Sequence, residues 1–168
     1  NYEAIYESIH YNYHQENQWS EPRIIDIGNK TADDHLNTTL LDEGTLILVS
    51  KNSIDRIDSP QFMLRIRDVH EKWTNIPYAK LTTSEMPTRP VVTRTSLGQI
   101  IEAHSVKNVK SKDYHISFSI IKKMEADWFV REILLVKARK NSTVNDVTFS
   151  KAPFPENAAW IVLLSDIE

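Results

Sequence analysis

The sequence has 168 residues, a formal net charge of −3 and 26% charged side chains, as expected for one globular domain. It contains no cysteine, which excludes disulfide scaffolds, cysteine-ligated zinc and iron–sulfur centres, and a cysteine nucleophile. Its three glycines form neither of the common glycine-rich loops that hold nucleotide phosphates.

The N-terminal segment predicts an amphipathic helix over residues 1–14. Its apolar residues recur at three- and four-residue spacings along one stripe. Four of the six tyrosines of the chain also lie in its first 13 positions. Tyrosine is common at protein interfaces because it buries a large area with few rotamers to freeze. We therefore expect an interface that contains Tyr2, Tyr6, Tyr11 and Tyr13.

Short strands are predicted next at residues 22–27 and 45–50, where β-branched residues and leucine dominate. Residues 61–69 alternate, with apolar side chains on one face and Arg65 and Arg67 on the other, which predicts a half-solvated strand. Three prolines between residues 70 and 94 indicate loop or edge structure.

Residues 96–106 predict a short helix, which Thr95 or Ser96 would cap. The strongest pattern follows: residues 113–121 alternate, and residues 128–139 form a longer apolar run after a short turn. This pattern predicts a β-hairpin whose second strand is the more buried one. Residues 147–150 and 158–166 predict two further strands, the latter buried.

These elements predict a single α+β domain over residues 1–168. The predicted helices and strands are segregated, not alternating, which argues against a parallel βαβ architecture. We expect a mostly antiparallel β-sheet or open barrel of about seven strands, with an N-terminal helix and one short helix near 96–106. A β-sandwich is the alternative.

Charge is distributed unevenly along the chain. Residues 1–60 carry four basic and eleven acidic side chains, whereas residues 61–168 carry sixteen basic and twelve acidic ones. The predicted hairpin would bring basic residues near its open end together. We therefore expect an anion-binding or nucleic-acid-binding patch at one sheet edge, formed by Lys107, Lys110, Lys112, Lys137, Arg139 and Lys140.

No catalytic signature accompanies this charge pattern. The chain lacks the GxSxG motif of serine hydrolases and the HExxH motif of metalloproteases. A Ser–His–Asp triad is defined by geometry, so sequence spacing does not exclude one that includes His104 or His115. We predict no catalytic residue, no metal ligand and no cofactor.

The preferred hypothesis is a non-enzymatic interaction or self-assembly module, a role that would suit a viral structural or accessory protein. Its partner would be a second copy or another protein, bound through the acidic tyrosine-rich N-terminal helix and the basic edge. One alternative is a nucleic-acid-binding module that uses the basic edge. A second alternative is a small hydrolase with a His/Asp site assembled by the fold. No apolar run is long enough for a membrane span, and we expect a soluble protein of the cytoplasm or nucleus.

Overall fold

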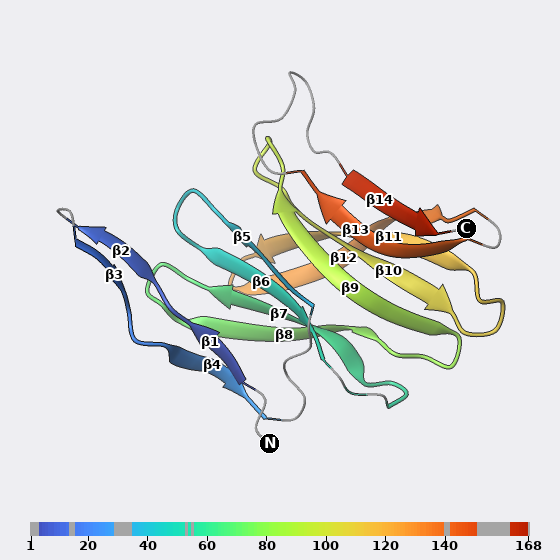
Figure 1. Ribbon diagram of the computed structural model, residues 1–168, viewed down its shortest axis with the longest axis horizontal. Helices are drawn as coiled ribbons and strands as arrows, with labels where there is room; N and C mark the ends of the chain where they lie inside the picture. The colour runs from blue at the N-terminus through green and yellow to red at the C-terminus, as the bar shows by residue number, and fades with distance from the viewer. Residues whose placement is uncertain are drawn as a thin grey trace.

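The structure is a computed structural model that describes residues 4–13, 16–28, 35–52, 54, 56–139, 142–150 and 162–167. These residues form strands that pair only in antiparallel fashion, and they contain no helix (Figure 1). The predicted antiparallel sheet structure is confirmed. The α+β class, with helices over 1–14 and 96–106, is wrong.

The first four-stranded sheet is a meander of strands in chain order: β5 (Leu36–Leu40), β6 (Leu46–Lys51), β7 (Pro60–Arg67) and β8 (Trp73–Lys80). The strands predicted at 45–50 and 61–69 are confirmed as β6 and β7. Phe62, Leu64 and Ile66 of β7 are buried on one face. Arg65 faces the other way but has no exposed surface either, so this strand is not half-solvated.

The second four-stranded sheet has the order β12 (Asp127–Lys137), β11 (Tyr114–Met124), β10 (Ile100–Asn108) and β9 (Glu85–Arg94). The proline-containing stretch 70–94 supplies β8 and β9, and each lies at the edge of its sheet. An edge strand tolerates proline because the N–H groups on one side of its backbone form no hydrogen bonds with a neighbouring strand. The edge interpretation of this stretch is therefore confirmed.

A tight turn replaces the helix predicted over 96–106. The backbone carbonyl of Thr95 accepts a hydrogen bond from the Gly98 N–H. Its side-chain hydroxyl accepts a second one from the Gln99 N–H at 3.0 Å. Thr95 thus caps a turn instead of a helix. The following residues of β10 are buried on both faces of the strand. A strand covered on both sides needs no alternation of polar and apolar residues, so the sequence pattern of β10 does not distinguish it from a short helix.

The predicted hairpin of 113–121 and 128–139 is confirmed as β11 and β12. Its burial is the reverse of the prediction, since β11 is buried from residues 116 to 121 and most of β12 is exposed. The register shifts between Phe118, which pairs with Leu134, and Ser119, which pairs with Glu132. Ile133 between them has no partner and forms a β-bulge.

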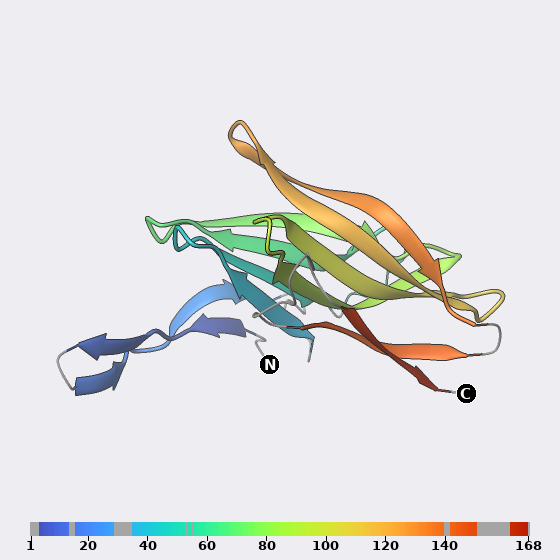
Figure 2. The same ribbon diagram turned by 90° about the horizontal axis from the view of Figure 1, so that it is seen from above.

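Both faces of the second sheet are covered. Against one face packs the hairpin of β13 (Thr143–Phe149) and β14 (Val162–Ile167), which contributes Val144, Val147 and Phe149 to a core with Phe118 (Figure 2). Leu163 and Leu164 of β14 are exposed, so the prediction of a buried strand at 158–166 is wrong for them. Against the other face packs the first sheet, through a second core.

The second core joins the two sheets. It contains these buried residues: Ile47, Val49, Leu64, Ile66, Val92, Ile100 and Ile121. Strands β5 and β9 lie side by side at one margin of this core, where the Val92 N–H donates to Asn37 Oδ1 at 3.0 Å. The two sheets therefore stay together along β5 and β9, while β8 and β12 are the opposite edges of their sheets.

A two-stranded ribbon replaces the helix predicted over 1–14. It contains β1 (Ala4–Glu7), β2 (His10–Tyr13), β3 (Glu16–Trp19) and β4 (Arg23–Ile27), where β1 pairs with β4 and β2 with β3. We call residues 4–27 the arm. Ile5 is 7% exposed and its neighbour Tyr6 is 60% exposed, which is the alternation of a strand. The strand predicted at 22–27 is confirmed as β4.

A buried arginine fixes the base of the arm to the first sheet. The guanidinium of Arg65 donates to Asp26 in β4, with a 3.1 Å bond from Nε, and also to the Ser50 hydroxyl in β6. A guanidinium without exposed surface has lost its hydration, so these acceptors must replace the water. The arm therefore satisfies a charge that would otherwise lie on the sheet without a partner.

We expect the Arg65→Ala variant to lose about 3 kcal/mol of unfolding free energy, because three hydrogen bonds to a charged group disappear and a cavity forms. Urea unfolding followed by tryptophan fluorescence measures the loss. The matched control is Arg131→Ala, which removes an exposed arginine on β12 and should change the midpoint little. Equal effects of the two substitutions would contradict this role of Arg65.

Candidate functional site

The basic residues predicted to form a patch lie at one end of the second sheet. Lys107 of β10 pairs with Tyr114 of β11, and Lys137 of β12 pairs with His115, the next residue of β11. The turn from β10 to β11 and the residues after β12 bring in the others. We call the following residues the cationic end: Lys107, Lys110, Lys112, Lys137 and Arg139.

The lysines of the cationic end keep their positive charge. None of its four lysines forms an ion pair with another residue, as far as the structure describes the chain. The Lys107 ammonium lies 5.9 Å from the centroid of the Tyr114 ring, which is within cation–π range. Glu85, opposite Asn108, and Asp113 are the carboxylates at this end. The sixth predicted residue, Lys140, lies outside the described residues.

The predicted tyrosine interface is only partly described. Tyr6 lies in β1 and is 60% exposed. Tyr2 lies outside the described residues, and so do the side chains of Tyr11 and Tyr13, whose backbone belongs to β2. Our sequence reasoning missed Trp19, which is 69% exposed and pairs with His10 in the middle of the arm.

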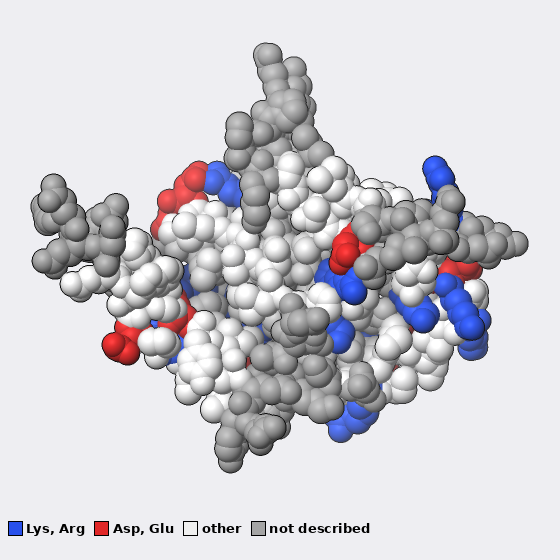
Figure 3. Space-filling model, in the orientation of Figure 1, with Lys and Arg blue, Asp and Glu red and all other residues white. Residues whose placement is uncertain are grey.

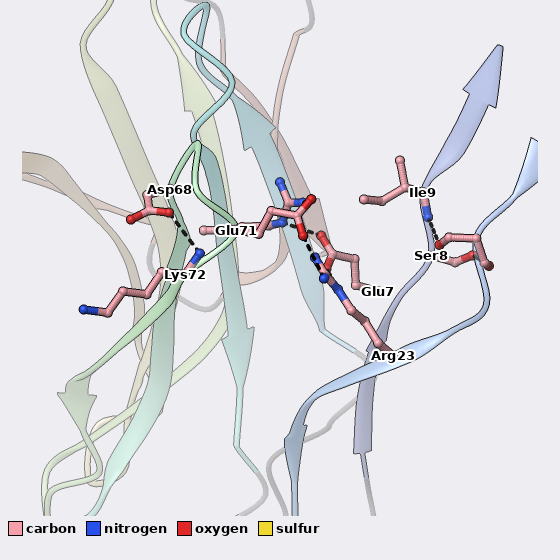
Figure 4. A network of polar contacts seen from close by, with 9 residues as sticks. Glu7, Ser8, Ile9, Arg23, Asp68, Glu71 and Lys72 are labelled. Atoms are coloured by element: carbon pink, nitrogen blue, oxygen red, sulfur yellow. Dashed lines mark hydrogen bonds and ion pairs between the residues drawn. The ribbon is translucent and has the colours of Figure 1, made fainter. Parts of the chain in front are cut away.

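Charged residues attach the arm to the turn between β7 and β8 (Figure 4). Arg23 of the arm donates to Glu7 at 2.6 Å and to Glu71 at 2.8 Å, and Arg67 of β7 lies within 2.7 Å of Glu7 and 2.9 Å of Glu71. Two arginines and two glutamates therefore alternate around a closed ring. Hydrogen bonding from Arg23 is the main reason that the pKa of Glu71 is lowered.

The arm and the cationic end lie at opposite ends of the molecule. The arm projects beyond the edge of the first sheet, whereas the turn between β10 and β11 and the end of β12 lie at the far end (Figure 1). Figure 3 shows Lys and Arg side chains gathered at that far end. An acidic segment and a basic surface that are separated in this way cannot neutralise each other within one chain.

Strand β12 adds exposed apolar side chains next to the cationic end. It is an edge strand, and five of its apolar residues are between 37% and 50% exposed: Phe129, Ile133, Leu134, Leu135 and Val136. Leu134 and Val136 pair with Phe118 and Ile116, so their side chains lie on the same face of the sheet as those two residues. This face is turned away from the first sheet, and we call it the outer face. Exposed apolar side chains on an edge strand are typical of an interaction site.

A cavity of about 450 Å³ with both polar and apolar walls lies between β8 and the second sheet. His104 and His115 line it from β10 and β11, and Ser117 and Glu132 from β11 and β12. Beside it, His104 Nδ1 lies 2.9 Å from Oε1 of Glu102, a carboxylate without exposed surface. Burial, and then the charge of Glu102, raise the pKa of Tyr78, which also lines the cavity.

This arrangement does not complete a serine hydrolase triad. Ser117 lies directly opposite His104 on the neighbouring strand. Its hydroxyl, however, donates to Glu132 Oε2 at 2.8 Å, and no hydrogen bond joins it to His104. A triad requires the histidine to take the serine proton. The Glu102–His104 pair therefore lacks a nucleophile among its described contacts.

The described residues contain no cluster of three or more histidine, aspartate or glutamate side chains able to hold a metal ion. They also include no helix with the length and apolar character needed to cross a membrane. No family model, curated protein or solved structure matches the chain. Functional inference therefore depends on the arm, the cationic end, the β12 surface and the cavity.

We expect the attachment of the arm to weaken in acid. A lowered pKa means that the ionised Glu71 stabilises the folded chain above the usual glutamate pKa, and that this stabilisation is lost as pH falls through the lowered value. Hydrogen exchange of the β1 and β4 amides should therefore quicken, relative to β10, as the pH falls below about 4. Glu71→Gln should remove much of this difference, and an unchanged difference in that variant would contradict the assignment.

Proposed function

We propose that this chain is a non-enzymatic self-association module in which the arm of one copy binds the cationic end of a second copy. The observation that carries the proposal is the location of these two surfaces at opposite ends of the molecule (Figures 1 and 3). Complementary surfaces that cannot meet within one chain can meet between chains. The helix expected at the N-terminus is replaced in this proposal by the two-stranded arm.

Charge complementarity supports this contact. Residues 1–27 contain five acidic side chains and one basic side chain, whereas the cationic end has five basic ones. Within the chain, Glu7 and Asp26 already pair with arginines at the base of the arm. Glu21 is exposed and forms no ion pair with the residues that the structure describes, so it is available to a second copy. Such pairing speeds association and selects the partner more than it raises affinity.

Apolar contacts would supply most of the affinity. The arm exposes Tyr6 and Trp19, and the outer face of β12 exposes Leu134 and Val136 beside the cationic end. Aromatic residues that insert into an apolar surface dominate the energetics of many interfaces. An isolated two-stranded ribbon is also only marginally stable in water, so docking would stabilise the outer half of the arm.

The contact is heterologous, since two different surfaces of the same chain meet. Such a contact either closes into a ring or continues as a filament, depending on the rotation between neighbouring copies. Every copy in the interior of the assembly would use its arm and its cationic end at once.

We expect sedimentation velocity to show association at low salt that weakens as salt is added. The double variant Lys107→Glu/Lys137→Glu should weaken it at least tenfold, because it puts two negative charges where the acidic arm docks. Lys122→Glu, at the other end of β11, is the matched control and should associate like the parent chain. A parent chain that stays monomeric at high concentration and low salt would overturn the proposal.

A mixing experiment tests the head-to-tail arrangement itself. Trp19→Ala impairs the arm but leaves the cationic end intact, and Lys107→Glu/Lys137→Glu does the reverse. Each variant alone should be mostly monomeric, whereas an equimolar mixture should form dimers and nothing larger. A mixture that does not associate, or variants that dimerise alone, would contradict a contact between two different surfaces.

Nucleic-acid binding is the second candidate, because the four unpaired lysines lie together with Tyr114 beneath Lys107. Neutralising four phosphates would give a salt slope of roughly −3.6 on duplex DNA. A titration of labelled duplex and single-stranded oligonucleotides at two salt concentrations measures it. Binding that Lys107→Glu/Lys137→Glu abolishes and Trp19→Ala leaves unchanged would favour this function, and absence of binding would remove it.

A further inference from the structure

We propose that the cavity between β8 and the second sheet binds a small amphipathic amine. Its volume of about 450 Å³ is within the range of small-molecule sites in proteins. The cavity is lined by residues from both sheets, at the margin opposite the one where β5 and β9 lie side by side. The proposed self-association uses none of its polar lining, so the two proposals are independent.

Two polar side chains of the cavity wall form no hydrogen bond within the described part of the protein. Ser119 lines the cavity and is only 4% exposed, and its hydroxyl is unbonded there. The buried hydroxyl of Tyr78 lies beside the carboxylate of Glu102, which interacts with it, so Tyr78 is not counted among these groups. The half-buried imidazole of His115 forms no hydrogen bond with the described residues either. A side chain as buried as Ser119 nearly always has a hydrogen-bond partner, so these two groups are available to a polar ligand.

The charges around the cavity favour a cation. Glu85 and Glu132 line it, and Lys80 is the one basic residue that does so among the described residues, apart from the histidines. Ser117 donates to Oε2 of Glu132, which leaves Oε1 of the same carboxylate to accept from a ligand. The buried carboxylate of Glu102 lies behind this wall and does not line the cavity. An ammonium group would supply an N–H donor to Oε1 of Glu132.

The remaining wall of the cavity is apolar. Val106 of β10 and Val130 and Leu135 of β12 line it. A ligand that places its ammonium near Glu132 would lay a hydrocarbon part against these side chains. Both features together select an amine with an alkyl or aryl group over a sugar, a carboxylate or an inorganic ion.

Amide chemical shifts of the labelled protein test the proposal. Phenethylamine and hexylamine should cause saturable shifts at Ser119 and Glu132, with the neutral analogues 2-phenylethanol and 1-hexanol at least tenfold weaker. Glu132→Gln should weaken the amines at least tenfold and bring them close to the alcohols, since it removes the charge but keeps the shape. Glu125→Gln, in the exposed turn between β11 and β12, is the control and should bind like the parent chain.

Three results would overturn the proposal: no saturable shift at these residues with either amine at millimolar concentration, equal affinity for an amine and its alcohol, or unchanged affinity in Glu132→Gln. Should Glu132→Gln fail to fold, Glu85→Gln tests the same charge from the other side of the cavity, with a several-fold weakening expected. Because Trp19→Ala leaves the cavity intact, that variant should bind both amines normally even where it no longer associates.

Discussion

The burial of Arg65 is the constraint on which the arrangement of this molecule depends. A guanidinium without exposed surface requires acceptors, and Asp26 of the arm supplies the charged one. Any other placement of β4 would leave that charge without a counterion in the interior. The pairing therefore determines where the arm meets the first sheet. The ring of Glu7, Arg23, Arg67 and Glu71 secures the same junction from the solvent side.

Because the base of the arm is fixed in this way, its other half extends beyond the sheets instead of folding back on them (Figure 2). The acidic segment of the chain consequently stays away from the cationic end. The buried ion pair of Arg65 and Asp26 therefore keeps the acidic arm at one end of the molecule and the cationic end at the other. The cavity at the edges of β8 and β12 arises separately, from the way the two sheets approach each other.

Local patterns predicted those strands whose apolar and polar residues alternate, or whose apolar run is short and rich in β-branched residues. The alternation of Phe62, Leu64 and Ile66 located β7, and the open end of the β11–β12 hairpin brought Lys107 and Lys137 to the same end of one sheet. Patterns failed where tertiary contacts decide. The spacing of Ile5, Tyr6 and Ile9 fits a helical stripe, but pairing with β4 directs Ile5 and Tyr6 to opposite sides of a ribbon.

The site in the cavity was out of reach of sequence reasoning for a related reason. Glu102, Ser119 and Glu132 come from three strands, and only the register of the sheet aligns them. The apolar run of β12 was misleading as well. Such a run usually indicates a strand covered on both sides, whereas β12 is an edge strand. An apolar run indicates only that its side chains are more stable away from water. A binding partner can exclude water from them as well as the protein interior can.

The bulge at Ile133 has a consequence for an edge of this kind. Before it, odd-numbered residues such as Phe129 point to the outer face, and after it even-numbered ones such as Leu134 do. A regular strand that paired along the whole of β12 would place its apolar side chains on the same face as those of β12 in one half, and on the opposite face in the other half. Open-ended stacking of identical strands, as in amyloid, requires one unbroken register. The bulge therefore allows β12 to expose apolar side chains without acting as a template for fibril growth.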